Sequence, residues 1–241
     1  MPHEWKRREE ERAARIPPTQ GAPGADARSR ERIVMSDKRV SEAVIHRLPR
    51  YYRELTDLKR RGIERISSSE LSDEMGLNAS QIRQDFNCFG GFGQQGYGYQ
   101  VDNLLHEISK ILGLTQSWNM VIVGAGNIGS ALLRYTGFDK DGYHIIGAFD
   151  SDPALHGQRI NDVLVHDASA LSAFLAENKV HIGVICTQKT NAQQVCDSMV
   201  KGGVRGIWNY APIDVTSDQA FVENVHLNDS LYVLSYRLNS D

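Results

Sequence analysis

The chain has 241 residues, of which 41% are hydrophobic and 24% charged, and its formal net charge is −3. This composition is typical of a soluble globular protein, and the length suits one large domain or two small ones. Its apolar runs fall short of the ~18 residues of a membrane span, and three scattered cysteines exclude a disulfide framework or a zinc site. We therefore expect a cytoplasmic protein with no membrane partner and no bound metal.

Basic residues gather near the front of the chain. Residues 36–66 carry nine basic and five acidic side chains. This excess is compatible with a nucleic-acid surface but does not establish one, because a basic helix face is usually only solvated. Residues 1–35 are rich in charge, Ala, Pro and Gly and hold few large apolar side chains. They are predicted to be a disordered tail, since they bury too little surface to offset the entropy of ordering.

The folded region is predicted to begin with helices. A helical period of apolar residues runs over 41–62, and Pro49 inside it predicts a kink or a break. Ser67 can cap a second, short helix that Gly76 ends, and Asn78 can cap a third. Two short helices joined by a tight turn form a helix-turn-helix, in which the second helix can enter a DNA major groove.

A wing and a closing helix complete this first unit. The third helix is expected to end near Phe89, and glycines alternate with aromatic residues over 90–99. That pattern fits a small β-hairpin, or wing, although a flexible loop over a phosphate would share it. A further helix over 101–112 leads to a linker. Together these elements predict a winged helix-turn-helix domain over residues 36–116.

Beyond residue 116 the sequence alternates between short apolar segments and helical segments. The expected strands lie at 120–123, 144–149, 180–186 and 206–208, and the expected helices at 127–135, 171–178 and 191–200. Buried strands that alternate with helices predict a parallel doubly wound sheet. The expected fold class is therefore α/β, with a Rossmann-type domain over 117–227 behind the winged helix domain and a C-terminal segment over 228–241.

The strongest motif is a glycine-rich turn directly after the first of these strands. Gly124, Gly126 and Gly129 have the G-x-G-x-x-G spacing that gives a tight turn, close approach of a pyrophosphate and tight helix–strand packing. Asp150 ends the second strand, where an acidic residue accepts ribose hydroxyls, and no arginine follows at Ser151 to meet a 2′-phosphate. This pattern predicts a site for NAD (NAD⁺ and NADH) rather than NADP. The candidate cofactor residues are Gly124, Ala125, Gly126, Asn127, Ile128, Gly129, Asp150, Ser151, Thr187, Asn209 and Tyr210.

The sequence leaves two alternatives to a DNA-binding regulator. A small NAD-dependent oxidoreductase would need an acid or base near the nicotinamide, and the histidines are too dispersed to form one, although His226 is a weak candidate. A CoA- or nucleotide-binding regulatory module would show no affinity for DNA. Cys186 and Cys196 are predicted core residues, and Cys88 is favoured as core over a redox-active thiol. No catalytic cluster is evident, so we expect a protein that is not an enzyme.

Several motifs occur in a characteristic order. They are Leu48-Pro49-Arg50-Tyr51-Tyr52-Arg53, Ser67-Ser68-Ser69-Glu70-Leu71, Ile82-Arg83-Gln84-Asp85-Phe86, Phe89-Gly90, Gly96-Tyr97-Gly98-Tyr99, the glycine-rich turn and Asn209-Tyr210-Ala211-Pro212. With these motifs, residues 36–241 closely resemble the Rex family of bacterial redox-sensing transcriptional repressors. The resemblance implies a homodimer that binds pseudo-palindromic double-stranded operator DNA and leaves it when NADH replaces NAD⁺. It also implies a C-terminal helix, matched by residues 229–239, that swaps onto the partner protomer.

The resemblance also assigns DNA contacts. Arg83 resembles the family's base- or phosphate-contacting arginine, and a guanidinium can reach guanine O6 and N7. Gln84 stands where many relatives carry a second basic residue, and Gln94 and Gln95 stand where many carry one in the wing. Fewer cationic contacts predict weaker and less salt-sensitive binding, or help from the basic tail. The candidate DNA contacts are Arg47, Arg50, Ser80, Gln81, Arg83 and Gln84, with Lys59, Arg60 and Arg61 as further phosphate contacts.

The family's switch differs here at one position. In some members an arginine of the first helix pairs across the dimer with an aspartate near the C-terminus, and a tyrosine near the cofactor completes the network. The matching residues here are Arg53, His226 and Tyr135. A histidine cannot form the same ion pair, and its protonated form would repel Arg53. The resemblance therefore implies a retuned switch that is less responsive to NAD⁺.

Overall fold

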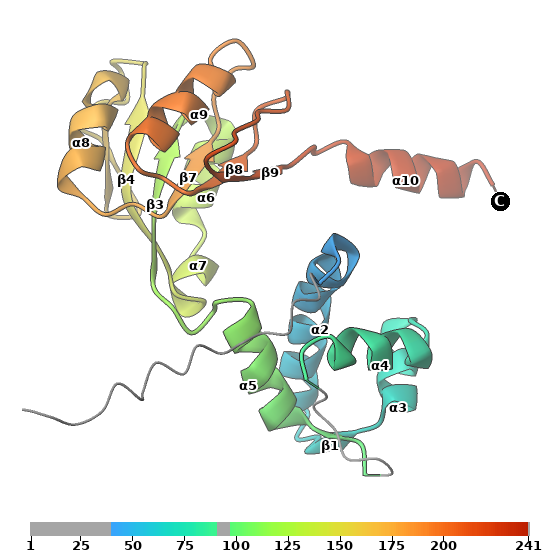
Figure 1. Ribbon diagram of the computed structural model, residues 1–241. Coiled ribbons are helices and arrows are strands. Elements are labelled where there is room, and N and C mark those ends of the chain that lie inside the picture. Colours follow the sequence, from blue (N-terminus) through green and yellow to red (C-terminus); the bar gives the residue numbers. More distant parts are fainter. Residues whose placement is uncertain (1–39, 91–96, 241) are drawn as a thin grey trace, which may run out of the picture. The chain divides into compact units, whose positions relative to one another are not determined.

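The computed structural model describes residues 40–90 and 97–240, which form two folded domains (Figure 1). The helical domain comes first in the chain and the α/β domain second, as the sequence predicts. The predicted tail, 1–35, and most of the predicted wing loop lie outside the described residues.

Within the described residues, the first domain consists of four helices and a two-stranded sheet. In chain order they are α2 (Glu42–Arg60), β1 (Arg65–Ile66), α3 (Ser68–Met75), α4 (Ala79–Asn87), β2 (Tyr99–Gln100) and α5 (Val101–Ile111). All four helices contribute to one buried cluster, which includes Leu55, Leu71, Phe86 and Leu104. Because α3 and α4 both place apolar side chains in this cluster, the predicted helix-turn-helix is held as a unit.

Pro49 does not break the first helix, although the sequence predicts a kink or a break there. α2 runs continuously through it from Glu42 to Arg60. A proline inside a helix costs about 3 kcal/mol. The helix buries a stripe that includes Leu48, Tyr51 and Leu55, each at most 1% exposed, and each such side chain contributes about 1.5–3 kcal/mol. Packing of this stripe therefore outweighs the local cost.

Local capping fixes the helix-turn-helix, as predicted. The Ser67 hydroxyl accepts a hydrogen bond from Glu70 N, and the Glu70 carboxylate accepts one from Ser67 N, which completes a capping box. Gly76 ends α3 with φ 60°, in the left-handed region that favours glycine. Asn78 caps α4 by accepting a hydrogen bond from Ser80 N at 2.7 Å.

The wing pairs two strands that are distant in sequence. β2 runs antiparallel to β1, with Tyr99 opposite Ile66. A Cβ atom at Gly98 would lie 2.8 Å from the Ile66 carbonyl oxygen, so only glycine allows this close approach. The expected hairpin within residues 90–99 lies largely outside the described residues. The described partner of β2 instead comes from before α3.

The second domain contains a seven-stranded sheet in the order β5-β6-β4-β3-β7-β8-β9. Its strands are β3 (Trp118–Val123), β4 (Tyr143–Asp150), β5 (Arg159–Ile160), β6 (Val163–Asp167), β7 (Ile182–Ile185), β8 (Gly206–Asn209) and β9 (Phe221–Asn224). All neighbouring strands are parallel except β5 and β6. Without the β5 edge strand this is the Rossmann order, in which the direction of winding reverses beside β3.

Apolar clusters cover both faces of this sheet. Val121 and Val123 of β3 belong to one cluster, whereas the intervening Ile122 belongs to the other. α8 (Leu171–Glu177) and α9 (Ala192–Lys201) lie together on one side (Figure 1), and α6 (Asn127–Arg134) contributes Leu133 to the other. The short helix α7 (Gly137–Lys140) follows α6. Alternation along β3 thus produces the two-sided burial expected of a doubly wound sheet.

The connection between β8 and β9 contains no helix. Asn209 donates to the Ile213 carbonyl oxygen at 2.6 Å and to Asn224 Oδ1 at 2.8 Å. Gln193 of α9 exchanges two hydrogen bonds with the backbone of Thr216, at 2.9 and 3.1 Å. Parallel strands usually need a helical crossover. Here three amide side chains hold residues 210–220 in place instead.

The C-terminal helix α10 (Asp229–Leu238) forms where the sequence predicts it. All ten of its residues are exposed in the single chain, including Leu231, Leu234 and Leu238. Isolated helices of this length are marginal in water unless their apolar side chains pack against something. No helix within residues 40–90 and 97–240 combines the length and apolar character needed to cross a membrane.

Candidate functional site

The glycine-rich turn between β3 and α6 has the geometry that its sequence predicts. Gly124 has φ +99°, and a Cβ atom there would lie 2.5 Å from the Cys186 carbonyl oxygen. A Cβ at Gly129 would lie 1.8 Å from the Gly124 carbonyl oxygen, so α6 packs against the turn at a distance that only glycine allows. At Gly126, no described atom lies within 4 Å of the Cβ position. Gly126 therefore leaves a surface that a pyrophosphate can approach.

The amino end of α6 faces this turn with its backbone. The helix begins at Asn127, and no side chain among the described residues caps it. The first N–H groups of a helix have no partners within it, and the helix dipole favours an anion at this end. Ala125 is buried and Ile128 half-buried, so these two candidate residues shape the turn and contribute backbone rather than polar side chains.

Asp150 ends β4 beside the turn. Its Oδ2 accepts a hydrogen bond from Ala125 N at 2.6 Å, and its Oδ1 accepts one from Asp152 N at 2.8 Å. Each carboxylate oxygen has a further lone pair, so both can still accept from ribose hydroxyls. Ser151 is exposed next to it. A fixed negative charge at this place disfavours a ribose that carries a phosphate.

Thr187 has a buried hydroxyl without a partner just beyond β7. Among the described residues, its Oγ1 atom receives and donates no hydrogen bond. The Thr187 nitrogen lies 3.0 Å from the Cβ position of Gly124, so the residue borders the turn. An unpaired buried hydroxyl costs about 1–3 kcal/mol, and a polar group of a bound molecule would remove this cost. The residues present therefore fit a dinucleotide at this turn.

The cysteines differ in exposure. Burial raises the pKa of the Cys186 thiol to about 12, so it stays protonated at neutral pH and is a poor nucleophile. Cys196 is fully buried in the core, as predicted. Cys88 is exposed at the end of α4, where its thiol lies 3.3 Å from the Gln84 carbonyl oxygen. The expectation that Cys88 is a core residue is therefore wrong, because it follows the last buried position of α4.

Asn209 ends β8 and Tyr210 follows it, at the same edge of the sheet. The Asn209 amide is fully buried, and its Oδ1 accepts a hydrogen bond from Ala211 N at 3.0 Å in addition to the two bonds that it donates. Its side chain thus positions the following loop and has no N–H left for a ligand. Tyr210 is half-buried against Trp208, with ring centroids 4.8 Å apart, and burial raises the pKa of its phenol.

The second helix of the helix-turn-helix exposes three candidate DNA contacts on one face. Ser80, Arg83 and Gln84 of α4 are exposed and spaced three and four residues apart. The Arg83 guanidinium donates to Ser80 Oγ and to Ser68 Oγ, both at 2.9 Å. Hydroxyl contacts of this kind orient a guanidinium without neutralising it. We call Ser80, Arg83 and Gln84 the α4 face.

Other candidate DNA contacts are occupied within the chain. Arg47 and Gln81 both bind the carboxylate of Asp85, and Arg50 donates to the Met75 carbonyl oxygen. Arg61 pairs with Glu74 at 2.9 Å. Lys59 and Arg60 pair with acidic residues at 2.8 and 3.4 Å. The surface ion pairs can exchange for phosphates, since each contributes less than about 1 kcal/mol, but Arg47 and Gln81 face inward.

The structure also reveals residues that the sequence analysis does not single out. Arg65 of β1 is exposed and donates to the Tyr97 carbonyl oxygen at 3.4 Å, so the wing carries an arginine even though Gln94 and Gln95 do not supply a cation. The sequence gives no local signal for this role, because Arg65 lies 32 positions from Tyr97. Ser68 orients Arg83, and Asp85 is buried, but both roles depend on contacts between helices.

The three switch candidates are all accessible in the single chain. Arg53 is exposed on α2. Tyr135 is 59% exposed and contacts Phe138 edge-on, with ring centroids 4.8 Å apart. The Nε2 atom of His226 lies 2.8 Å from Asp214 Oδ1. A carboxylate is thus present beside His226, although the histidine itself cannot supply one.

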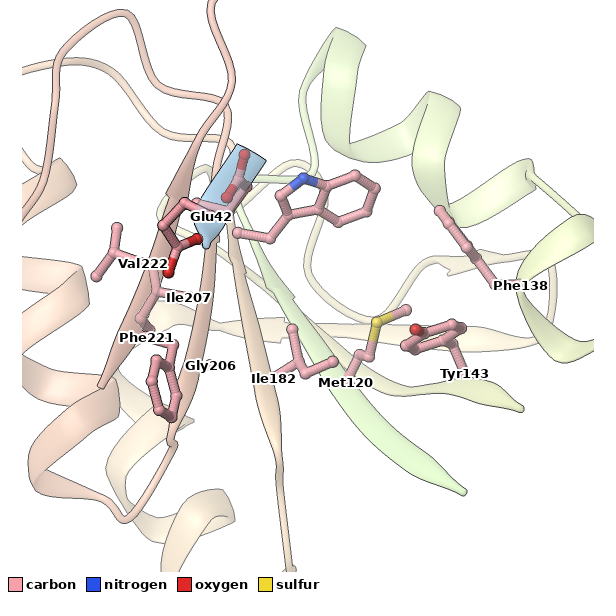
Figure 2. Close-up of a pocket in the computed structure, with 11 residues that line it drawn as sticks. Glu42, Met120, Phe138, Tyr143, Ile182, Gly206, Ile207, Phe221 and Val222 are labelled. Carbon is pink, nitrogen blue, oxygen red and sulfur yellow. The ribbon is translucent and has the colours of Figure 1, made fainter. Parts of the chain in front are cut away.

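An apolar surface lies at the amino ends of the strands (Figure 2), whereas the glycine-rich turn follows the carboxyl end of β3. Tyr143, Ile182 and Phe221 are each the first residue of their strands, and Phe221 is 85% exposed. We call this region the amino-end surface; its lining residues in this domain include Met120, Phe138, Tyr143, Ile182, Ile207, Trp208, Phe221 and Val222.

Comparison with known proteins assigns both domains. Residues 39–87 match the family described as "Putative DNA-binding protein N-terminus", and residues 115–213 match the family described as "CoA binding domain". A "Redox-sensing transcriptional repressor Rex" of Clostridium novyi is 55% identical over 207 residues, which are 85% of this chain and 99% of the relative. The protein of the same name from Thermoanaerobacter pseudethanolicus is 52% identical over 209 residues, which are 86% of this chain and 93% of the relative.

Solved structures give the same assignment. The crystal structure of RSP, described as a Rex-family repressor, has a TM-score of 0.79 and 50% identity and covers 84% of this chain and 95% of that chain. RSP in complex with beta-NAD⁺ and operator DNA has a TM-score of 0.80 and 52% identity, covering 84% of this chain and 94% of that chain. RSP in complex with beta-NADH has a TM-score of 0.78 and 50% identity, with 83% and 95% covered. Because this similarity extends through both the winged helix and the nucleotide-binding domain, the chain belongs to the Rex family of redox-sensing transcriptional repressors.

Proposed function

We propose that this chain represses transcription by binding operator DNA through the α4 face and the wing, and that it releases the operator when NADH replaces NAD⁺. The observation that carries the proposal is the presence in one chain of an oriented Arg83 on a helix-turn-helix and a turn open at Gly126 beside the unpaired Thr187 hydroxyl. The relative RSP is described in complex with beta-NAD⁺ and operator DNA and with beta-NADH.

The residues around Tyr210 favour a neutral ring over a cationic one. The nicotinamide is positively charged in NAD⁺ and uncharged in NADH. Near Tyr210, Cys186 stays protonated and Ala211 is uncharged, so neither of these two described residues supplies an anion to a buried cation. Burial of an unpaired charge is unfavourable. These residues therefore support tighter binding of NADH, and a full switch between 1:99 and 99:1 needs about 5.5 kcal/mol of differential affinity.

The same residues support a regulator that carries out no turnover. Asn209 has both polar atoms occupied in its own loop, and the Cys186 thiol is not ionised. His226 bonds to Asp214 and lies two residues beyond β9. None of these side chains is arranged as a general acid or base beside the glycine-rich turn, which hydride transfer to a second substrate would need.

We also propose that the working unit is a homodimer in which α10 of each protomer covers the amino-end surface of the other. The apolar side chains of α10 are exposed in the single chain, with Leu238 at 71%. The amino-end surface is likewise apolar and exposed at Phe221. A patch of this kind marks a protein interface. Two-fold symmetry would then place two α4 helices on the two halves of a palindrome.

Fluorescence anisotropy of a labelled palindromic operator tests the proposal. We expect binding that NADH abolishes and NAD⁺ leaves in place, and weaker binding to a single half-site of the same length. CoA is the control ligand, because one matched family is described as CoA-binding. Its phosphorylated ribose would meet the Asp150 carboxylate, so CoA should not compete. Operator binding that ignores NADH, or no operator binding at all, would refute the proposed function.

A further inference from the structure

Asp85 is a charged residue buried in the middle of the DNA-binding domain. Its side chain is 1% exposed, although Gln84 beside it is exposed on the α4 face. Four hydrogen bonds satisfy the carboxylate. Arg47 donates from Nε to Oδ2 at 2.7 Å and from Nη2 to Oδ1 at 2.8 Å, Tyr51 donates to Oδ2 at 2.7 Å, and Gln81 donates to Oδ1 at 2.8 Å. We call these four residues the Asp85 network.

The Asp85 network joins two helices with different tasks. Arg47 and Tyr51 lie one turn apart on α2, whereas Gln81 and Asp85 lie one turn apart on α4. The fork of the Arg47 guanidinium matches both carboxylate oxygens, and a bidentate pair fixes orientation as well as distance. α4 therefore cannot rotate about its axis or slide along α2 without breaking several of these bonds.

Apolar packing alone leaves this freedom. Phe86 meets Tyr51 and Tyr99 edge-on, with ring centroids 5.0 and 5.2 Å apart, and these contacts hold α4 against the core. Apolar contacts are non-directional, so they set how deeply the helix sits more than its rotation. In some proteins a buried ion pair is retained for a specific arrangement rather than for stability. The Asp85 network therefore fixes the rotation of α4, which the apolar contacts alone do not fix.

Rotation of α4 matters because the α4 face reads the DNA if the proposed function holds. Arg83 lies two residues from Asp85, on the exposed side of the same helix, and bidentate recognition of a guanine edge tolerates little displacement. We propose that Asp85 is a positioning residue for operator recognition, which sets the rotation of α4 so that Arg83 and Gln84 face the bases. Arg47 and Gln81 then serve recognition from inside the domain rather than as DNA contacts.

The charge of Asp85 is maintained under binding conditions. Burial by itself would raise the pKa of this carboxyl, but the hydrogen bonds from Arg47, Tyr51 and Gln81 together hold the pKa below its ordinary value. The network is therefore intact at neutral pH. Replacing the carboxylate with an amide keeps the volume but removes the charge and one acceptor oxygen, so Asp85→Asn is the sharpest probe.

The first measurement compares affinity for the operator with affinity for a scrambled duplex, using the full chain and Asp85→Asn. We expect operator affinity to fall about tenfold or more, which is the scale of one base-specific contact. Affinity for the scrambled duplex and the slope of log K against log salt should stay unchanged, because the phosphate contacts remain. A loss of folded protein would lower both affinities equally. Asp73→Asn, at an exposed position of α3, is the charge-matched control.

Hydrogen exchange of the DNA-free protein separates this inference from the proposed function. We expect Asp85→Asn to speed amide exchange in α4 while α5 exchanges as in the unmodified protein. If the unmodified protein does not distinguish the operator, the proposed function fails and the exchange pattern still decides the role of Asp85. Unchanged exchange in α4, or equal acceleration in α4 and α5, would overturn the positioning role.

A second variant covers the case in which Asp85→Asn does not fold. Tyr51→Phe keeps the aromatic packing on Phe86 and removes one 2.7 Å hydrogen bond to Asp85. We expect it to reduce the ratio of operator affinity to scrambled-duplex affinity by a smaller factor than Asp85→Asn does. It should also speed amide hydrogen exchange in α4. A Tyr51→Phe protein with the unmodified ratio and unmodified exchange would contradict the proposal.

Discussion

At the scale of single residues, Asp85 links the protonation of one carboxyl to the stability of the DNA-binding domain. Its pKa is lower in the folded state than in the unfolded state, so its contribution is complete above the unfolded pKa of about 3.9. That contribution is lost as the pH falls through the lower, folded pKa. Acid therefore removes the stabilisation.

Urea unfolding of the unmodified protein and Asp85→Asn at several pH values tests this coupling. At pH 7 we expect the variant to be less stable by about 3 kcal/mol, the low end for breaking a buried pair, since Arg47 keeps some exposure to solvent. The difference should shrink as the pH falls below about 4. Fluorescence of Trp118 and Trp208 gives an internal control, because both lie in the other domain. If the difference in unfolding free energy between the two proteins stayed constant with pH, the Asp85 carboxyl would not be the group that couples stability to pH.

The sequence indicates which residues can bind DNA but not which of them face it. Arg47 and Gln81 have suitable chemistry, and they stand on the same helices as Arg50 and Arg83. Gln81 reaches Asp85 along its own helix, whereas Arg47 reaches it only because α2 packs against α4. Asp85 itself reads as an ordinary polar helix residue, because nothing local distinguishes a buried carboxylate from a solvated one. Its role depends on a contact between residues 38 positions apart.

At the scale of elements, the glycines of the glycine-rich turn have different roles. Gly124 and Gly129 are needed for the fold, and we expect Gly126 to be needed for binding. We expect Gly126→Ala to fold normally, because no described atom lies within 4 Å of the added Cβ. It should lose most of its affinity for NADH, because the methyl group occupies the space needed for close approach of the pyrophosphate. Thermal unfolding with and without NADH measures both effects. The unmodified protein should gain about 2.7 kcal/mol at 100 times the dissociation constant, and the variant much less.

Gly129→Ala is the matched comparison for that prediction. Its Cβ would lie 1.8 Å from the Gly124 carbonyl oxygen, so this substitution should destabilise the domain even without ligand. If Gly126→Ala unfolded as readily as Gly129→Ala, or bound NADH normally, the division of roles would be wrong.

Elements with local signals are predictable from the sequence, and elements that depend on distant partners are not. Ser67, Gly76 and Asn78 mark helix ends because each acts within its own turn of chain. The break expected at Pro49 fails because packing across the domain decides it. β5 and β9 are missed because they are short, and β6 and β9 also depend on pairing with the separate strands β4 and β8. Asn161 and Asp162, both with positive φ, form the two-residue turn that could have indicated the β5–β6 hairpin.

At the scale of the whole molecule, we expect His226 to affect how the proposed dimer responds to the oxidised cofactor. Its partner Asp214 lies 2.8 Å away in the same chain. We expect His226→Asp to increase by about tenfold the factor by which NAD⁺ strengthens operator binding, a typical size for allosteric coupling. The added carboxylate would attract Arg53 of the other protomer, whereas a histidine does not. Operator titrations with and without NAD⁺ measure this factor.

His226→Asn is the control for the switch, because it is polar but carries no charge. It should leave the response to NAD⁺ at the level of the unmodified protein. A His226→Asp protein with an unchanged response would end the hypothesis of a retuned switch. The sequence suggests this comparison only through the resemblance to the family, since Arg53 and His226 are on different domains and a single chain gives no reason to pair them.

The helix-free connection between β8 and β9 has a consequence for how this protein tolerates change. Residues 210–220 look like a surface loop in the sequence, the kind of segment in which insertions usually accumulate and proteases cut. Asn209, Asn224 and Gln193 nevertheless tie its backbone at several points. An inserted residue would break one of these hydrogen bonds, whereas in an unrestrained loop it would only add length. Natural variation in length should therefore be as rare here as within a strand, and a protease should cut elsewhere first.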